Sequence, residues 1–513
     1  MKKIVFLLSS VCWLSLSGCE KDLEQAPLSS GSTPTFYQTQ ADFDQALTSA
    51  YSPLSTYPTR ALNLSETRSD NIYGVDDLGV RDWAPVNNFS TALVNNPYIA
   101  EAWSGNYNGI FRVNTLLDQL TTNGSVVGEA TRARYEGEAK FLRAFYYFDL
   151  VRFFGKVPLI DKALVPAEVA KIPRMPVADV YNLIISDLQT AITNLPATYD
   201  ASVTADKPNV GRATANAAKS LLALVYLTRS GPTYGIEGPG LATNEYNKAL
   251  PLLNEVLTSG KYAFLPSYPD IFSYTNENNK EVIFDIQFIS GGIGLGGDFP
   301  SLLVPGAYFT YLKIPFESGG LEIRPIANNL LDSYPAGDVR KTFNFAQGYT
   351  STTGFKETRW LMKKYLNENF KGSSRTDWGI NWIVLRYTDV LLMKAECILH
   401  GAGGSQAEVD NAVNQVRARA GVTTKLTGVT LPQLMEERRR ELAGEGSRWH
   451  DLVREGLVLT TINTWIPVED TRTRMSRNAS GAFVPVDANQ IIYPVPQAER
   501  SAAPGLYDQN LGY

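Results

Sequence analysis

Apolar residues recur at helical spacing through most of this chain. In residues 141–148 and again in 218–225, they stand at i, i+3, i+4 and i+7, which puts them on one face of a helix. A longer apolar stripe covers residues 180–195 and ends at Pro196, where a helix is expected to stop. Another long helix is predicted around residues 387–398. The pattern therefore predicts a mainly α-helical protein.

Two of the predicted helices share an internal repeat. Residues 139–147 and 218–226 carry Ala, Lys, Leu, Ala and Tyr at matching positions. Each copy comes after another amphipathic segment, residues 101–120 in the first case and 177–195 in the second. Further helix pairs are predicted elsewhere, namely 244–260 with the segment directly after it, and 383–400 with 406–420.

Repeated helix pairs of this kind stack as tetratricopeptide-like units, and the alternative is a set of unrelated amphipathic helices rich in Ala and Leu. We expect a tetratricopeptide-like helix-pair scaffold (an α/α superhelix) at about residues 101–260 and 383–455. Long irregular loops with short β segments interrupt it at about 60–98 and 265–382. Loops of this length are usually functional, so we expect the insertions to carry recognition.

The N-terminus has the pattern of an export signal. Residues 1–18 combine a basic start with a short apolar stretch, which is too short to span a bilayer. Leu16-Ser17-Gly18-Cys19 matches a bacterial lipobox, so cleavage is expected to leave Cys19 as a lipidated N-terminus. The alternative is an ordinary secreted protein with a chance cysteine. Residues 19–34 are predicted to be a flexible tether, and their first acidic residues, Glu20, Asp22 and Glu24, resemble a surface-export signal.

Composition excludes several classes of protein. The net charge of −5 provides no basic surface for nucleic acid. Only two histidines, His400 and His450, are present, which leaves almost no material for a His-rich metal site or a Ser-His-Asp triad. Cys397 is the single cysteine beyond Cys19, so no intramolecular disulfide is expected. No cofactor and no metal are predicted.

Several segments resemble one family. The run EAKFLRAFYYFDLV at 138–151, followed by FGKVPL at 154–159, is similar to the best-known segment of the SusD/RagB lipoproteins. Similar stretches occur in the same order as in that family, at 36–47, 385–396, 437–454 and 493–513. On these motifs the chain, residues 35–513, is identified as a single SusD-like domain.

The resemblance implies a function at the cell surface of Bacteroidetes. Such proteins are lipid-anchored to the outer membrane, bind oligosaccharide or polysaccharide and deliver it to a SusC-like TonB-dependent transporter. A minority of relatives, of the RagB type, bind peptides instead. The family is non-enzymatic. A glycoside hydrolase on a helical scaffold is the more distant alternative, and it would need two carboxylates about 5–10 Å apart in a cleft.

The charged block 436–454 invites an enzymatic interpretation, because Glu437 and Glu441 share a helix face and His450-Asp451 lies close by in the sequence. However, arginines alternate with these glutamates, which is the pattern of structural ion pairs. We therefore predict that this block stabilises the fold.

A glycan site needs aromatic faces for sugar rings together with polar groups for the hydroxyls. Arg81-Asp82-Trp83 supplies both, and Trp83 is the first candidate; the alternative is that Trp83 anchors its loop to the helical body. The other candidate ligand-binding residues are Asp70, Asn71, Tyr73, Tyr308, Tyr311 and Trp378. Trp103 and Trp382 are assigned to core packing. The sequence does not distinguish starch, fructan, xylan or host glycans.

Overall fold

The structure is a computed structural model that describes residues 36–73, 81–315, 324–351, 354–473 and 483–513. The predicted signal (1–18), the tether (19–34) and Cys19 lie outside the described residues. These assignments stay predictions.

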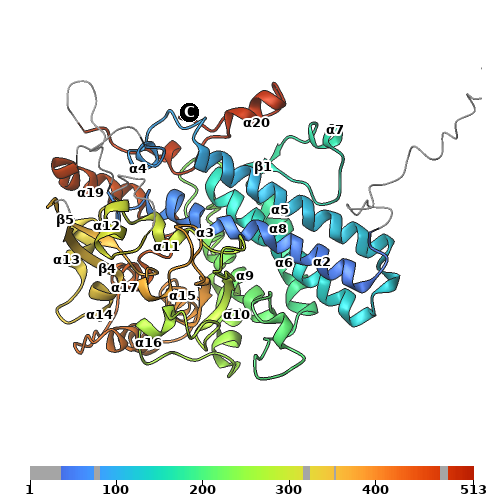
Figure 1. The fold of residues 1–513 in the computed structure, drawn as a ribbon. Helices are drawn as coiled ribbons and strands as arrows, with labels where there is room; N and C mark the ends of the chain where they lie inside the picture. The colour runs from blue at the N-terminus through green and yellow to red at the C-terminus, as the bar shows by residue number, and fades with distance from the viewer. Residues whose placement is uncertain (1–35, 74–80, 316–323, 352–353, 474–482) are drawn as a thin grey trace, which may run out of the picture.

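Stacked helix pairs form the right-hand half of the molecule in Figure 1. The first pair is α5 (Pro97–Thr122) with α6 (Glu129–Phe154), and the second is α8 (Val177–Asn194) with α9 (Ala215–Ser230). Helix α6 packs on both α5 and α8, and α8 packs on α9. The repeated motifs lie on α6 and α9, the second helix of each pair. The predicted helix-pair scaffold is confirmed.

Small residues allow α5 and α6 to approach closely. A Cβ atom on Gly109 of α5 would lie 2.3 Å from the ring of Tyr146 on α6, so no larger side chain fits there. Tyr146 is fully buried, and its hydroxyl donates a 2.7 Å hydrogen bond to the Ala50 carbonyl. This contact also fixes the N-terminal helix α2 (Gln40–Tyr51) against the first pair.

The third helix pair is built differently from the prediction. Helix α10 (Tyr246–Thr258) packs on α9 and on α15 (Tyr387–Leu399), which lies far along the chain. The sequence directly after α10 forms loops, a short 3-10 helix and strand β3 (Val282–Ile286). The insertion therefore interrupts the pair, and α15 then also packs on α16 (Gln406–Arg419), as predicted.

The insertion leaves and rejoins the scaffold through one antiparallel strand pair. Strand β3 pairs with β6 (Trp382–Arg386), with Val282 opposite Arg386 and Ile286 opposite Trp382. Between them lie a hairpin and short helices on the left of Figure 1: α11 (Phe299–Leu302), α12 (Gly306–Tyr311), α13 (Asn328–Ser333), α14 (Val339–Asn344), β4 (Phe345–Thr350) and β5 (Lys356–Met362). The predicted short β segments are thus present.

The remaining elements are mostly short. Near the N-terminus they are η2 (Ser52–Thr56), α3 (Tyr57–Arg60), η3 (Ala61–Glu66) and α4 (Ala84–Asn87). Beside the helix pairs lie η4 (Gly124–Val126), β1 (Val157–Pro158), α7 (Pro166–Val169), β2 (Arg174–Met175), η5 (Lys207–Asn209) and η6 (Pro269–Phe272). After β5 come η7 (Glu368–Phe370), α17 (Leu431–Leu442), α18 (Arg448–Arg454), α19 (Val458–Thr473), η8 (Ala488–Gln490) and α20 (Gln497–Ala502).

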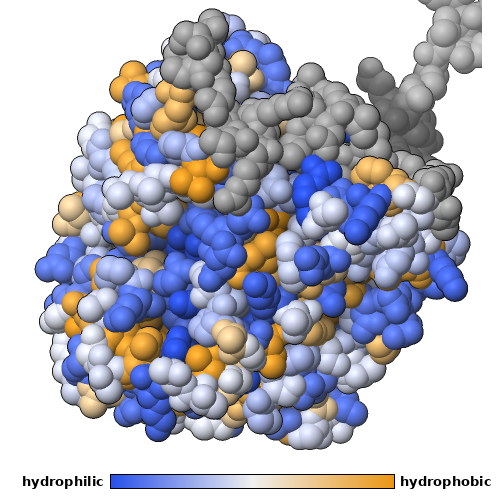
Figure 2. Space-filling model, turned by 90° about the vertical axis from the view of Figure 1, so that its left-hand side faces the viewer, coloured by the Kyte–Doolittle hydropathy of each residue, from blue (hydrophilic) through white to orange (hydrophobic). Residues whose placement is uncertain are grey.

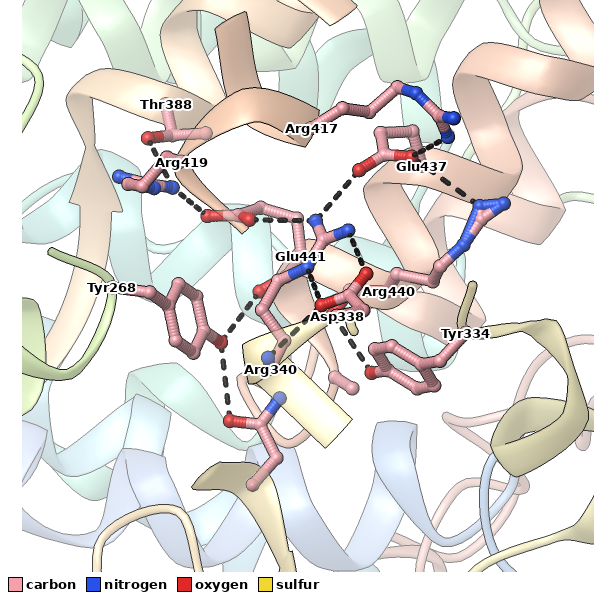
Figure 3. Close-up of polar contacts among 12 residues, drawn as sticks. Tyr268, Tyr334, Asp338, Arg340, Thr388, Arg417, Arg419, Glu437, Arg440 and Glu441 are labelled. Atoms are coloured by element: carbon pink, nitrogen blue, oxygen red, sulfur yellow. Dashed lines mark hydrogen bonds and ion pairs between the residues drawn. The ribbon is translucent and has the colours of Figure 1, made fainter. Parts of the chain in front are cut away.

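The charged block on α17 and α18 is a buried ion network, as predicted. Figure 3 shows the part of it around Glu437 and Glu441 of α17. Glu441 accepts hydrogen bonds from Arg340 Nη1 at 3.0 Å and from Arg386 Nη1 at 2.7 Å, and it also pairs with Arg419. Burial acts to raise the pKa of Glu441, but the three guanidinium groups outweigh it and hold the pKa well below the usual range. The network joins α17 to α14, β6 and α16, so it locks the insertion onto the scaffold.

Trp103 and Trp382 lie in the core, with 3% and 0% of their surfaces exposed, as predicted. Among the described residues, we find no helix whose length and apolar character would let it cross a membrane.

Candidate functional site

A large cleft lies where the N-terminal elements meet the insertion. Its volume is about 990 Å³. One wall comes from the end of α2, from η2, α3 and η3, and from the first turns of α5. The other comes from the end of β3 and the glycine-rich loop after it, near residues 287–298. The cleft therefore lies between parts of both insertions that we expected to carry recognition, beside α2 and α5.

Tight helical turns shape the floor of the cleft. Pro53 and Pro58 stand at the first turns of η2 and α3. A backbone N–H in the first turn has no acceptor within the helix, so its absence in proline costs no hydrogen bond. The chain then widens into a π-helix, η3, in which the Thr67 N–H donates to the Leu62 carbonyl five residues earlier, at 2.9 Å. Such turns occur frequently at functional sites. Here the turn places Arg60 and Asn63 along the cleft.

Arg60 is buried but only partly paired. Its side chain is 1% exposed, with Nε 3.4 Å from Asp149 and Nη1 3.5 Å from Glu101. Within the described part of the chain, neither Nε nor Nη2 has a partner at hydrogen-bonding geometry. A buried donor without an acceptor costs free energy, about 1–3 kcal/mol or more for a charged group. Nε already faces the Asp149 carboxylate, and both atoms are themselves buried, so a ligand in the cleft would reach Nη2 only with a local rearrangement of the floor.

Asn63 repeats this arrangement one turn later. Its Oδ1 accepts a 2.6 Å hydrogen bond from Arg324 Nη1, whereas its Nδ2 has no acceptor among the described residues. Nearby, Thr59 Oγ1 donates to Asp298 Oδ1 at 2.7 Å across the cleft, which joins α3 to the glycine-rich loop. The floor therefore offers buried donors, and Asp298 and Glu101 offer carboxylate acceptors at its sides.

Two carboxyl groups on the opposite wall are held at unusual pKa values. Burial raises the pKa of both Glu277 and Asp285 to about 7, and the negative charge of Glu277 adds to the effect on Asp285. Asn381 links them, because its backbone N–H donates to Glu277 at 2.6 Å and its Nδ2 donates to Asp285 at 3.0 Å. Near neutral pH this wall therefore changes charge.

The glycine-rich loop is shaped by close backbone contact. A Cβ atom on Gly296 would lie 2.4 Å from the Cα of Asp377, so only glycine fits at this position of the loop. The Asp377 carboxylate accepts hydrogen bonds from the N–H groups of Gly291 and Gly292. This arrangement presents Ile289 and Leu295 at the rim, with 54% and 59% of their surfaces exposed.

The cleft has the chemistry of a polyol-binding site. Sugar hydroxyls both donate and accept hydrogen bonds, so they match a cleft with carboxylate acceptors at its sides and unpaired donors buried directly beneath its floor. The aliphatic rim and the half-buried Tyr98 provide apolar surface for the C–H faces of a sugar ring. Within the described ranges, no group of three or more His, Cys, Asp or Glu side chains is placed to hold a metal ion.

Most of the predicted ligand-binding residues are buried, and Trp83 is the clearest case. Trp83 is 1% exposed, and the Arg324 guanidinium lies 5.3 Å from its ring centre. Because Arg324 also binds Asn63, Trp83 supports the cleft floor from beneath and does not present a ring face to solvent. These contacts agree with the alternative interpretation that Trp83 anchors its loop. The other buried candidates are Asp70, Asn71, Tyr73, Tyr308 and Trp378.

Asp70 and Asn71 belong to the polar core around α17 and α18. Asp70 pairs with Arg448 at 2.8 Å and with Arg439 at 3.1 Å. Burial acts to raise the pKa of Asp70, but the two arginines outweigh it and lower the pKa to about 2. Asn71 donates to Glu66 and accepts from Arg439. These contacts use the polar groups that were expected to meet a ligand.

The other early-loop candidates have mixed positions. Tyr73 is 7% exposed and packs in a cluster with Phe89 and Trp449. Arg81 is half-buried, whereas Asp82 is exposed and its carbonyl accepts from Asn96.

In the late insertion, Trp378 is fully buried and its backbone pairs with Gly297. Trp378 thus positions the glycine-rich loop from inside. Tyr308 and Tyr311 are brought together on α12, where their ring centres are 5.7 Å apart and Tyr311 is 48% exposed. They lie beside Tyr349, which was not among the predicted residues.

Arg60, Asn63, Glu101 and Asp298 were likewise not among the predicted residues. The signal that was available is the run Pro58 to Asn63, where a proline-started turn carries an Arg and an Asn at i and i+3. Helical spacing puts such residues on one face. The acceptor Asp298, however, lies 239 positions after Thr59 in the sequence. The local pattern could therefore not show that α3 and the glycine-rich loop meet.

Two family profiles match the chain. The profile described as "SusD family" matches residues 280–513, and the profile described as "Starch-binding associating with outer membrane" matches residues 23–227. SusD-like protein P25 of Formosa agariphila is 27% identical, over 89% of this chain and 92% of that protein. The chain belongs to the SusD/RagB family, as its motifs indicated.

Solved structures agree with this assignment. Surface glycan-binding protein A from Bacteroides thetaiotaomicron superposes with a TM-score of 0.75 at 25% identity, covering 93% of this chain and 100% of that one. A laminarin-binding SusD-like protein superposes with a TM-score of 0.74 at 26% identity and the same coverage. Membership of this family of binding proteins confirms the prediction that the chain is not an enzyme.

Proposed function

We propose that this chain is a surface-exposed, lipid-anchored glycan-binding protein that captures oligosaccharide or polysaccharide and delivers it to a SusC-like TonB-dependent outer-membrane transporter. The observation that carries the proposal is the cleft over Arg60 and Asn63, whose buried donors lack acceptors within the described chain. Family membership supports the same function, since similar proteins are named for glycan binding.

Binding in this cleft is reversible and involves no covalent step. Sugar hydroxyls donate to the carboxylates of Glu101 and Asp298, and they accept from Arg60 and Asn63 when the floor opens to expose these buried donors. Hydrogen bonds to charged groups contribute roughly 1.5–3 kcal/mol each, so a few of them select for a hydroxylated ligand. The cleft is wide and open to solvent, which suits capture of a chain that must later be released.

Delivery depends on the predicted anchor. A lipid on Cys19 and the tether 19–34 would keep the domain beside its transporter at high effective concentration. The domain then acts as a lid, and a ligand that contacts both lid and transporter favours the closed state. The domain can reach external polymer only when it faces outward at the outer membrane.

The identity of the glycan is approached first through relatives. A relative with 26% identity binds laminarin, which makes laminarin and laminarihexaose the first probes for this chain. Starch, xylan and inulin complete the panel. Peptide binding, as in RagB-like relatives, is tested with a casein digest in the same assay.

The experiment is affinity electrophoresis of the purified protein against this panel, followed by calorimetry with the polysaccharide that retards it most. The key variant is Arg60→Lys, which keeps the charge and loses the guanidinium fork. Its control is Arg143→Lys, because Arg143 is similarly buried at 5% exposure but pairs with Asp187 inside the scaffold.

We expect the wild-type protein and Arg143→Lys to bind a polysaccharide and Arg60→Lys to bind it at least five-fold more weakly. Wild-type binding to the peptide digest alone, or equal loss in both variants, would contradict the proposal. Incubation with each polysaccharide should release no shorter product. Co-purification of the transporter with the membrane-anchored protein tests the partner.

A further inference from the structure

A second hollow lies beside the cleft, and we call it the side hollow. Its volume is about 480 Å³, within the range of small-molecule sites, about 300–1,000 Å³. It is formed by the loop between α8 and α9, by the turn after α10 and by the chain that leads into β3. The cleft and the side hollow are adjacent, because five residues line both of them: Val210, Gly211, Arg212, Glu277 and Asp285.

Two exposed amides mark the boundary between the cleft and the side hollow. Gln287 lines the cleft, and Asn278 lines the side hollow. Asn278 Nδ2 donates to Gln287 Oε1 at 3.2 Å, and Gln287 Nε2 donates to Asn278 Oδ1 at 3.1 Å. A Cβ atom on Gly211 would lie 2.6 Å from Gln287 Cδ, so the Gln287 side chain passes directly over this glycine. Because both amides are exposed, the hydroxyls of a ligand can replace these hydrogen bonds.

The side hollow has the mixed surface that a sugar needs. The half-buried rings of Tyr199 and Tyr262 provide apolar surface. Burial raises the pKa of Tyr262, and hydrogen bonding with side chains such as Thr198 offsets only part of this effect, so the Tyr262 hydroxyl stays neutral and can both donate and accept. Asp200 and Lys280 are exposed and add charged groups to the lining. These groups match the hydroxyls and the C–H faces of a sugar ring.

We propose that the side hollow is a second subsite for the same glycan, and that one polysaccharide chain runs from the cleft past Asn278 and Gln287 into it. This inference rests on the proposed function. Amides suit such a path, because each of them both donates and accepts hydrogen bonds, as a sugar hydroxyl does. Glu277 and Asp285 stand at the junction, where they line both spaces and add acceptors for hydroxyl donors.

A polymer that is already held in the cleft fits the side hollow better than a protein partner does. A stable protein interface buries at least roughly 1,200 Å² in total, whereas the side hollow is a small concave space. The face that carries α12, β4 and β5 shows apolar residues as small separate patches among hydrophilic ones (Figure 2). We therefore place the extension of the glycan site in the side hollow, which adjoins the cleft, and not on that face.

The first variant, Asn278→Gly, removes one of the two amides at the boundary. Asn278 has a φ of 51°, a left-handed backbone conformation that glycine adopts without strain, so the substitution tests the side chain alone. The control is Asn244→Gly. Asn244 is also exposed and has a φ of 53°, but it lines neither the cleft nor the side hollow.

The second variant, Ala201→Trp, fills part of the side hollow. Ala201 is exposed and belongs to its lining, so an indole there occupies space that a sugar would need. The control is Ala263→Trp, because Ala263 is also exposed and lines neither the cleft nor the side hollow. Thermal unfolding confirms that each variant is folded.

The measurements are calorimetry with laminarin, or with the panel polysaccharide that the wild type binds, and hydrogen exchange of the full chain with and without that ligand. Residues 198–201 and 260–262 line the side hollow and not the cleft. We expect the polysaccharide to protect their backbone amides from exchange in the wild type and to leave them unprotected in Ala201→Trp.

We expect Ala201→Trp to bind the polysaccharide roughly tenfold more weakly and Asn278→Gly several-fold more weakly, since the second contact of one bound chain is intramolecular. Asn244→Gly and Ala263→Trp should bind like the wild type. Normal binding by both test variants, or no protection of residues 198–201 and 260–262, would overturn the second subsite and leave the cleft as the glycan site. Equal losses in the test variants and their controls would also overturn it. A wild-type protein that binds no polysaccharide would overturn the proposed function itself.

Discussion

Arg324 Nη1 donates a 2.6 Å hydrogen bond to Asn63 Oδ1. The bond connects residues 261 positions apart and ties the late insertion to the π-helical turn on the cleft floor. It also decides the orientation of the Asn63 amide, because the oxygen is occupied by Arg324 and the Nδ2 remains without an acceptor among the described residues.

Asn63 variants separate stability from binding. Asn63→Ala leaves Arg324 without this acceptor, so we expect a loss of about 1–3 kcal/mol in the free energy of unfolding. Asn63→Asp keeps the acceptor oxygen and adds a charge beside Arg324, so stability in urea should stay near that of the wild type. It replaces the donor with a carboxylate oxygen, however, and glycan affinity by calorimetry should fall several-fold. If Asn63→Asp bound glycan normally, Asn63 would have no donor role in the cleft.

The pair Glu277 and Asp285 predicts an unusual pH dependence. Their pKa values are raised to about 7 in the folded protein, whereas ordinary carboxyls titrate near pH ~4. Between about pH 4 and 7 the folded chain therefore holds more protons than the unfolded chain, and this pair lowers stability as the pH rises.

Glu277→Gln removes one of these buried charges and keeps an acceptor for the Asn381 N–H. We expect the variant to unfold at a higher temperature than the wild type at about pH 8 and at a similar temperature at about pH 4.5. Calorimetric melting at intervals of one pH unit measures this difference. Parallel melting curves at all pH values would contradict the raised pKa.

We expect substitution of Glu441 to cause one of the largest losses in the free energy of unfolding. Glu441→Gln leaves Arg340, Arg386 and Arg419 facing a neutral side chain in a buried network, and breaking such a network costs about 3–5 kcal/mol. Because its pKa is lowered, its stabilising contribution is present above the ordinary carboxyl pKa and is lost as the pH falls below it.

Urea unfolding at neutral pH measures this loss. The control is Glu136→Gln, since Glu136 forms an exposed pair with Lys140 on α6 and should contribute less than about 0.5 kcal/mol. Equal effects of the two substitutions would show that the buried network contributes no more than a surface pair.

Cys19 carries the predicted anchor. Cys19→Ala should abolish acylation and release the protein from the outer-membrane fraction. Membrane fractionation and protease treatment of intact cells measure its location. A variant that stayed membrane-bound would show that attachment does not require this cysteine.

Local patterns were sufficient for the scaffold. The apolar stripes and the repeated motif on α6 and α9 depend on neighbours within one or two turns, so helical periodicity alone identifies them. The alternation of Arg and Glu on α17 likewise predicted structural ion pairs. The partner of α10 was not predictable, because α15 comes only after the whole insertion.

Aromatic and polar residue types were a less certain guide to the site. Trp83, Asp70 and Asn71 have the right chemistry for a glycan, but their partners Arg324, Arg439 and Arg448 come from distant segments and bury them. Arg60 and Asn63 lie in the predicted insertion 60–98, but their residue types did not single them out. Their importance comes from missing partners, which can be recognised only when the surrounding chain is in place.

The sequence by itself determined the family, the helix pairs and the predicted route to the membrane, because these depend on short-range periodicity and on linear motifs. Tertiary structure decided which polar groups are satisfied and which remain open. Burial and hydrogen-bond partnership are set by residues far apart in the sequence, and that is why the cleft over Arg60 and Asn63 emerged only from the folded chain.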